Sequence, residues 1–269
     1  MADSNGRLAL VTGGSFGLGL AMAGHLRANG FEVLACARSK ERLEKAAEEL
    51  PGLRTLPVDI TCASDVDRLF ETVGAAEEPL DLLVNNAAIS RAHDYTSDYT
   101  LAEDRARDEI ETNFLAPIEL VRRYLQMRRE RGWESRPATI ANVSTPGALF
   151  PLEANPIYSC SKAGFHFFTS SLRRQLAKTP VDVVEIFPPA LDTGLAPDLV
   201  IPGIGENGPD VIDEVAKRSV EGILAGEAKI LPHPGSVSLV EAVGDAAERV
   251  ADGVNQTVLR AENWSPSGA

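Results

Sequence analysis

Cysteine, histidine and long apolar runs are all scarce in this sequence. The 269 residues include three cysteines, Cys36, Cys62 and Cys160, and four histidines, none at a spacing typical of a metal site. So few cysteines, odd in number, predict reduced thiols in a cytoplasmic protein. No run of about 18 apolar residues occurs, so we expect no transmembrane helix. Residues 1–7 are polar and lack the apolar stretch of a signal peptide.

Basic residues are also few. There are 26 lysines and arginines against 39 aspartates and glutamates, which gives a formal net charge of −13. Such an acidic chain repels phosphate backbones and anionic lipid surfaces, so we expect neither nucleic acid nor membrane as a partner. The hydrophobic content of 44% is ordinary for a globular protein and sufficient for a large core.

Short apolar segments alternate with longer helical patterns along the chain. The expected strands are 8–11, 31–36, 53–58, 80–84, 138–143, 181–186 and 228–231, and the expected helices are 18–29, 39–50, 64–76, 101–131 and the segment that carries Tyr158. Strands that are apolar on both faces and alternate with helices indicate a parallel sheet covered on both sides. We therefore predict an α/β fold, with residues 1–269 forming one doubly wound domain of about seven strands. Glycine and proline are dense within 190–212, which we expect to be a mobile loop over a site.

Tyr158 and Lys162 are the residues most informative about chemistry. They stand four positions apart in a predicted helix and so share one face. Alone, such a pair is common, and a packed tyrosine near a solvated lysine is the simpler interpretation. About 140 residues upstream, however, residues 12–19 form a glycine-rich turn. Together the two features suggest a proton-donating phenol beside a cation that lowers its pKa, which favours an oxidoreductase.

The glycine-rich turn lies between the first expected strand and the first expected helix, where a dinucleotide fingerprint requires it. Gly13 allows a tight turn, and Gly17 and Gly19 let the backbone approach a pyrophosphate closely. The helix start presents free N–H groups and a positive dipole end to the phosphates. The residues expected to bind the dinucleotide are Gly13, Ser15, Phe16, Gly17, Leu18 and Gly19. The alternative is a tight turn in an unrelated α/β protein.

The end of the second expected strand indicates which dinucleotide binds. An acidic side chain at this position favours the ribose hydroxyl of NAD, whereas an arginine favours the 2′-phosphate of NADP. The segment here is Cys36-Ala37-Arg38-Ser39-Lys40, without an acid. A guanidinium can bind a phosphate through two hydrogen bonds. We therefore predict NADP(H), held by Arg38 and Ser39; the alternative is that Arg38 is a solvated surface charge.

With the glycine-rich turn and the Tyr158–Lys162 pair taken together, the chain resembles the short-chain dehydrogenase/reductase family over nearly its whole length. The matching segments occur in the family's order and are 12–19, Asp59, Asn85-Asn86-Ala87-Ala88, Asn113, Tyr158 with Lys162, and Pro188-Pro189-Ala190-Leu191-Asp192-Thr193. Six signals in register are far more specific than any one of them. The resemblance implies a Rossmann-type fold. It also implies a homodimer or homotetramer, built by the Tyr158 helix and the helix over 101–131.

The resemblance further implies contacts to the cofactor. The positions concerned are Asp59, Ile60, Asn85, Ala87, Pro188 and Thr193, in addition to Tyr158 and Lys162. Asp59 would hydrogen-bond the adenine amine near the Ile60 backbone, and Thr193 would contact the nicotinamide carboxamide. Asn85 would line the cofactor groove. The alternatives are a helix cap for Asp59 and a strand-end turn for Asn85.

Catalytic roles follow from the same resemblance. Lys162 would hold the nicotinamide ribose, and Asn113 would position a water that links it to solvent. Lys162 and the oxidised nicotinamide would both lower the pKa of Tyr158. The family's catalytic serine lies thirteen positions before the tyrosine, where this chain has Thr145. We assign the hydroxyl role to Thr145, with Ser144 as the alternative. Adjacent strand residues point to opposite faces, so we expect only one of the two hydroxyls to reach the site.

Two departures from the family pattern stand out. Ala88 replaces the last glycine of Asn-Asn-Ala-Gly, which narrows or shifts that turn. Pro188-Pro189 replaces Pro-Gly and resembles the branch that includes D-alanine-operon oxidoreductases, whose substrates are poorly defined.

The reaction that the resemblance implies is hydride transfer between NADP(H) and a carbonyl or secondary alcohol. Phe150, Leu152 and the apolar residues within 190–212 suggest a fairly hydrophobic small molecule, although they could equally pack a core or a subunit interface. Two other functions stay open: an epimerase or dehydratase that retains its cofactor, and a non-enzymatic dinucleotide-binding regulator.

Overall fold

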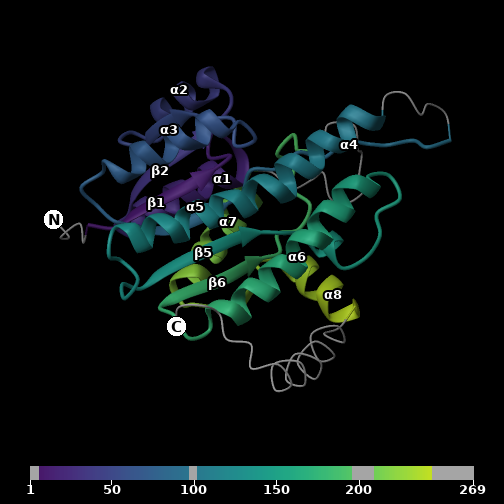
Figure 1. Cartoon of the computed structure of the whole chain (residues 1–269). Helices are drawn as coiled ribbons and strands as arrows, with labels where there is room; N and C mark the ends of the chain where they lie inside the picture. Colours follow the sequence, from purple (N-terminus) through teal and green to yellow (C-terminus); the bar gives the residue numbers. More distant parts are fainter. Residues whose placement is uncertain (1–5, 97–101, 196–208, 244–269) are drawn as a thin grey trace.

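A parallel β-sheet forms the centre of the computed structural model, which describes residues 6–96, 102–195 and 209–243 (Figure 1). The strands are β1 Leu8–Thr12, β2 Glu32–Ala37, β3 Arg54–Pro57, β4 Leu80–Asn85, β5 Ala138–Val143, β6 Val181–Ile186 and β7 Lys229–Ile230. Their order is β3-β2-β1-β4-β5-β6-β7, and every neighbouring pair is parallel. The order reverses beside β1, which is where a doubly wound sheet binds its ligand. The predicted doubly wound α/β fold is confirmed.

Helices cover both faces of the sheet. They are α1 Gly17–Ala28, α2 Lys40–Glu49, α3 Ala63–Gly74, α4 Ala102–Ile110, α5 Ala116–Glu130, α6 Pro156–Leu176, α7 Pro209–Leu224 and α8 Pro234–Val243. Helices α1, α2 and α7 pack with Val11 and Val84 in one core. Helices α3, α5 and α6 pack with Leu10 and Leu83 in the other. Successive strand residues therefore enter opposite cores, which explains why the strands are apolar on both faces.

The helix predicted over 101–131 is interrupted. Residues Glu111–Leu115 form a π-helical turn, called η1, between α4 and α5, although Figure 1 shows the three as one long rod across the sheet. Pro117 opens α5 and has no N–H to donate to a carbonyl one turn back. A π turn absorbs such a defect and is frequent at functional sites. Asn113 lies within it, so the interruption sets the direction of that side chain.

The C-terminal third differs most from the prediction. Helices α7 and α8 were not expected, and α7 begins at Pro209, inside the segment 190–212 predicted to be a loop. The density of glycine and proline suggested a loop, but proline is also favoured at the first position of a helix. Residues 196–208 of that segment and the tail after 243 lie outside the described residues.

A row of polar side chains crosses the sheet beneath α6. Asn85, Asn142 and Glu185 are neighbours in register on β4, β5 and β6, and all three are buried. Asn85 donates to Asn142 at 2.9 Å, and Asn142 donates to Thr169 of α6 at 2.9 Å. His166 of α6 lies 3.0 Å from both carboxylate oxygens of Glu185. These polar pairs give α6 one register on the sheet, because any other would leave buried groups unpaired.

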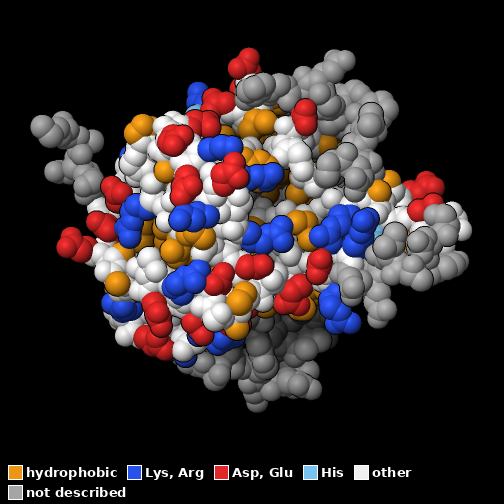
Figure 2. Space-filling model, turned by 90° about the horizontal axis from the view of Figure 1, so that it is seen from above, with side chains coloured by type: hydrophobic (Ala, Val, Ile, Leu, Met, Phe, Trp, Pro, Cys, Tyr) orange, Lys and Arg blue, Asp and Glu red, His pale blue; other side chains and the backbone are white. Residues whose placement is uncertain are grey.

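The molecular surface near α2 and α3 carries charges of both signs. Figure 2 looks down on the face near α2 and α3, where basic and acidic side chains are intermixed with small hydrophobic groups. Within the residues described, none of the helices has the length and hydropathy needed to cross a membrane.

The polar row yields a stability prediction. Asn142→Ala should lower the free energy of unfolding by about 2–4 kcal/mol, because it leaves two buried partners without their hydrogen bonds. Thr139→Ala, on the same strand but partly exposed, is the matched control and should change stability by less than about 1 kcal/mol. Urea denaturation monitored by circular dichroism measures both. Equal losses in the two variants would contradict a structural role for the row.

Candidate active site

The glycine-rich turn connects β1 to α1 in a strained backbone conformation. Gly13 and Gly17 have φ of +65° and +57°, which side chains with a Cβ rarely adopt. The amides of Gly13 and Gly14 donate to the carbonyl of Cys36, at 2.8 and 3.3 Å, and so tie the turn to the end of β2. The residue before α1, Phe16, provides no side-chain cap. The first amides of α1 are therefore left for a ligand, as expected for a phosphate site.

Gly19 lies where α1 packs against the glycine turn. A Cβ at this position would lie 2.4 Å from the Gly13 carbonyl oxygen and 2.5 Å from Asn86 Nδ2. The space is filled by the protein's own chain, so Gly19 lets α1 pack closely on the turn, and its expected approach to pyrophosphate stays a prediction. Gly17 lies nearer the cofactor side, because a Cβ there would meet Thr193 at 2.9 Å.

Thr12, which the sequence analysis did not single out, locks two strands together at this edge. Its hydroxyl donates to the Val84 carbonyl at 3.3 Å and accepts from the amides of Asn86 and Ala87, each at 3.0 Å. Asn86 returns a 2.9 Å hydrogen bond to the Thr12 carbonyl. The segment after β4 is thus held against the glycine turn, which places Ala87 at the predicted groove. A threonine at the end of a strand carries no sequence signal for this role.

The end of β2 presents basic side chains next to the turn. Arg38 is exposed, and Ser39 caps α2 by accepting a 3.2 Å hydrogen bond from the Arg42 amide. The Arg42 guanidinium stacks 4.7 Å from the centre of the Phe16 ring. Arg42 was also missed by sequence reasoning, although its place in the first turn of α2 puts it near the Arg38 segment. This end of the groove is suited to a phosphate ester.

Asp59 follows β3 and is partly engaged within its own loop. Its Oδ1 accepts from the amide and the hydroxyl of Thr61, at 2.9 and 2.7 Å, and its amide donates to Asp65 at 2.8 Å. This local turn orients the carboxylate at the sheet edge, with Ile60 buried beside it. The expected contact to adenine stays a prediction.

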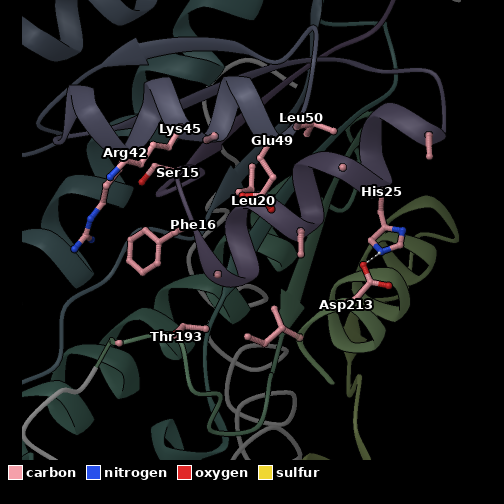
Figure 3. Close-up of a pocket in the computed structure, with 17 residues that line it drawn as sticks. Ser15, Phe16, Leu20, His25, Arg42, Lys45, Glu49, Leu50, Thr193 and Asp213 are labelled. Atoms are coloured by element: carbon pink, nitrogen blue, oxygen red, sulfur yellow. Dashed lines mark hydrogen bonds and ion pairs between the residues drawn. The ribbon is translucent and has the colours of Figure 1, made fainter. Parts of the chain in front are cut away.

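An open cleft of about 970 Å³ runs from the glycine turn between α1, α2 and α7 (Figure 3). Ser15, Phe16 and Arg42 line one end, and Thr193 lies across from them. At the far end, His25 contacts Asp213 at 2.8 Å and so joins α1 to α7. Thr193, from the segment after β6, lies next to Gly17 in this cleft, and its contact with the nicotinamide stays a prediction. Pro188, earlier in that segment, is buried.

Tyr158 and Lys162 lie on the first turns of α6 and are both buried. The Lys162 Nζ atom is 6.0 Å from the centre of the Tyr158 ring and donates a 2.8 Å hydrogen bond to the Val143 carbonyl at the end of β5. Burial lowers the pKa of Lys162 to about 8, although Glu185 acts in the opposite direction. The lysine is therefore held against the end of β5.

The predicted lowering of the Tyr158 pKa is wrong for the free protein. Burial raises the pKa of the phenol above its usual value, and the carboxylate of Glu109 raises it further. Desolvation, the larger of the two causes, disfavours the charged tyrosinate. The phenol is protonated at neutral pH, which is the form needed to donate a proton.

Asn113 connects the π turn to its surroundings. Its side chain accepts from the Ile89 amide at 2.9 Å, and it donates to the Ile89 carbonyl at 2.8 Å and to Ser161 at 3.1 Å. Asn113 thus joins η1, the segment after β4 and α6, close to Lys162. The water relay expected at this residue stays a prediction.

Two hydroxyls stand at the end of β5. Thr145 is partly exposed, and its hydroxyl accepts a 3.3 Å hydrogen bond from the Gly147 amide, which leaves its proton to donate elsewhere. Ser144 is buried, and its hydroxyl has no hydrogen-bond partner within the described part of the chain. A group that polarises a substrate must be reachable, which favours Thr145, whereas the unpaired hydroxyl keeps Ser144 as the alternative.

Asn85 belongs to the polar row, where its Nδ2 donates to Asn142. Its expected contact with the cofactor was inferred from resemblance alone. The polar row identifies a structural role for this side chain, namely joining β4 to β5.

A buried pair, Glu109 and His93, is the residue set that sequence reasoning missed most clearly. Glu109 lies one helical turn before Asn113, and His93 belongs to the segment after β4. A glutamate within a charged helix segment gives no sign of burial.

Comparison with known proteins agrees with this arrangement. The short chain dehydrogenase family model matches residues 7–200. The oxidoreductase DltE of Bacillus subtilis (strain 168) is 38% identical over 187 residues, which cover 69% of this chain and 72% of DltE. A short chain dehydrogenase from Burkholderia cenocepacia J2315 in complex with NADP has a TM-score of 0.73 at 22% identity, covering 91% of this chain and 95% of that one.

A second solved structure also shares the fold. A 3-ketoacyl-(acyl-carrier-protein) reductase from Brucella melitensis, complexed with NADH, has a TM-score of 0.74 at 24% identity and covers 84% of this chain and 96% of that one. In this chain the glycine turn follows β1, and the Tyr158–Lys162 pair lies on α6, which follows β5. Together with the match over residues 7–200, they show that the chain belongs to the short-chain dehydrogenase/reductase family.

Proposed function

We propose that this protein is an NADP(H)-dependent oxidoreductase that interconverts a carbonyl and a secondary alcohol on a fairly apolar small molecule. The observation that carries the proposal is the buried Tyr158 phenol, protonated and within reach of the charge of Lys162, on the helix that follows the Thr145 loop. A glycine cradle with free helix amides lies at the same edge of the sheet. Family membership supports redox chemistry at such an edge.

The residues present fit a nicotinamide dinucleotide. Gly17 takes a positive φ that leaves the start of α1 open, and Thr193 stands across from it. When bound, the dinucleotide would supply or accept the hydride. Arg38, Ser39 and Arg42 would hold the 2′-phosphate, Asp59 the adenine, and Lys162 the nicotinamide ribose. Solved structures with this fold carry either NADP or NADH. The fold therefore does not distinguish the two dinucleotides, and the choice of NADP(H) rests on Arg38.

The chain's own groups then handle the proton. Thr145 donates a hydrogen bond to the carbonyl oxygen and polarises it. Tyr158 gives its proton to the oxygen as negative charge develops there, and takes it back when an alcohol is oxidised. Lys162 stabilises the tyrosinate formed in reduction, since an adjacent cation favours the charged phenol. Asn113 bonds to the Ile89 amide and to Ser161, the residue before Lys162, and so keeps the chain around the lysine in place.

Apolar side chains near the Thr145 loop support a hydrophobic substrate. Phe150 and Leu152 are partly exposed, and a Cβ on Gly147 would touch Leu152 at 2.7 Å. Leu191, in contrast, packs partly buried against the core that contains α1. The apolar residues within 196–208 lie outside the described part.

The surface of α6 and η1 supports a homo-oligomer. Phe167 is 59% exposed and Leu115 is 45% exposed, both large hydrophobic side chains on the helices predicted to form subunit contacts. Burial of such residues between copies stabilises an interface. We propose a homodimer or homotetramer built on these helices.

The central test is Tyr158→Phe. Loss of the proton donor should reduce turnover of ketone substrates by about 10² or more while NADPH binding is unchanged. Absorbance of NADPH with a panel of apolar ketones and aldehydes measures turnover, and NADPH fluorescence measures binding. Tyr124→Phe removes another buried hydroxyl, one bonded to the Leu80 carbonyl, and should retain full turnover. Wild-type turnover in Tyr158→Phe would contradict the mechanism; products without net NADPH consumption would indicate an epimerase or dehydratase.

Removal of the Thr145 hydroxyl and removal of the Ser144 hydroxyl, both after β5, should have different effects on kcat. Thr145→Ala should lower kcat by about 10²–10³, as expected for loss of one donor to the developing oxyanion. Ser144→Ala, which removes a buried hydroxyl, should leave kcat within about threefold of the wild type. The same NADPH assay compares them. The reverse pattern would transfer the role to Ser144.

Arg38→Ala tests the cofactor assignment. The variant should bind NADPH about tenfold or more weakly, because it loses a charge-assisted hydrogen bond, while its affinity for NADH stays the same. Lys40→Ala is the control, since this nearby cation pairs with Glu44 at 3.7 Å. Fluorescence titrations with both dinucleotides give the affinities. A wild type that prefers NADH would reject NADP(H).

A further inference from the structure

The side chain of Arg42 reaches from the first turn of α2 to the glycine turn. The Cζ atom of its guanidinium lies 4.7 Å from the centre of the Phe16 ring, and Figure 3 shows the two side chains next to each other. A cation over an aromatic ring at this distance is attracted by the negative face of the ring. The Phe16 ring belongs to neither hydrophobic core and is 42% exposed, so packing of the protein interior does not account for a ring at this position.

The cations around this contact differ in what neutralises them. Lys40 and Lys45 each pair with a glutamate one turn away on α2, at 3.7 and 2.9 Å. Arg38 and Arg42, in contrast, have no carboxylate partner among the residues that the structure describes, and there no oxygen accepts a hydrogen bond from the Arg42 guanidinium. The donors of two arginines are therefore left for an anion at the end of β2.

The backbone on both sides of the contact is fixed. The Gly13 amide donates to the Cys36 carbonyl at 2.8 Å, which joins the glycine turn to the end of β2. The Arg42 amide donates to the Ser39 hydroxyl at 3.2 Å, which caps α2. Phe16 thus stands at a set position relative to the start of α2. An arginine side chain held against a ring at such a position loses less rotamer freedom on binding an anion than one that is free in solvent.

The contact lies at the dinucleotide end of the cleft. Ser15, Phe16 and Gly17 line this end together with Arg42 and Thr193. The uncapped amides at the start of α1 belong to the same region. NADP differs from NAD only by the 2′-phosphate on its adenosine ribose. This phosphate is the group on the dinucleotide that two unpaired guanidinium groups at the end of β2 are suited to recognise.

We propose that Phe16 is a positioning residue that sets the preference for NADP(H) over NAD(H) by holding Arg42 for the 2′-phosphate. The inference rests on the proposed function for the identity of the dinucleotide, and it adds to Arg38 a second determinant, supplied by the glycine turn itself. The ring acts through the guanidinium and leaves the rest of the cofactor untouched. Removal of the ring therefore weakens the binding of NADP(H) and leaves the binding of NAD(H) unchanged.

Fluorescence titrations of the full chain with NADPH and NADH give the ratio of the two affinities. Phe16→Leu keeps an apolar side chain and removes the aromatic face. It should lower the affinity for NADPH by about two- to fivefold, as expected for an exposed cation–π contact, and leave that for NADH unchanged. Phe16→Tyr keeps a ring and should retain the wild-type ratio. Lys45→Ala is the matched control, because this cation lines the same cleft but pairs with Glu41, and it should change the ratio by less than about twofold.

A double-mutant cycle with Arg42→Ala shows whether the ring acts through the arginine. Arg42→Ala should weaken NADPH binding by about tenfold, and the addition of Phe16→Leu should cause no further loss. Losses that multiply in the double variant would show that the ring acts without the arginine. An equal loss for NADH in Phe16→Leu would show that the ring only shapes the turn. Either result, or an unchanged ratio in Phe16→Leu, overturns the proposal.

The titrations do not depend on turnover. A lowered ratio in Phe16→Leu that Phe16→Tyr restores, with no ketone consumed by the wild type, would retain the positioning role and reject the redox reaction. Turnover that depends on Tyr158 and prefers NADPH, with an unchanged ratio in Phe16→Leu, would do the reverse. A wild type that binds NADH more tightly than NADPH would reject both the positioning role and the assignment of NADP(H).

Discussion

The site depends on how α6 is seated on the sheet. Lys162, His166 and Thr169 lie along one side of the helix and each bonds to a different part of β5 or β6. These partners, Glu185 and Asn142 among them, are buried polar groups, so a shift of the helix by one turn would leave several of them unpaired. The register of α6 in turn sets the direction of Tyr158, the proposed proton donor.

The rest of the site is assembled at the carboxyl edge of parallel strands. Thr12 bonds the end of β1 to the segment after β4, and the carbonyl of Cys36 holds the glycine turn against β2. Because all strands run in one direction, their following loops meet at the same edge. Thr193, more than 170 residues after Gly17 in the chain, therefore lies beside it. A single topological constraint brings the proposed cofactor cradle and the proposed proton donor to the same edge.

Much of the fold was predictable from the sequence because it rests on local patterns. Strands apolar on both faces, as in β1 and β4, indicate a covered parallel sheet, and the glycine turn and the Tyr158–Lys162 spacing identify the two ends of the site. Where local patterns are ambiguous, prediction fails. Pro209 was read as part of a loop although it opens α7, and Pro117 interrupts a helix pattern that otherwise runs without a break.

The sequence by itself determined the strand–helix alternation, the order of the motifs and the identity of the main chemical groups, since these depend on neighbours along the chain. Only the tertiary structure decided the electrical state of those groups. The raised pKa of Tyr158 follows from burial and from Glu109, and the lowered pKa of Lys162 follows from burial. Desolvation and through-space fields depend on which residues meet in three dimensions, and chain spacing does not encode them.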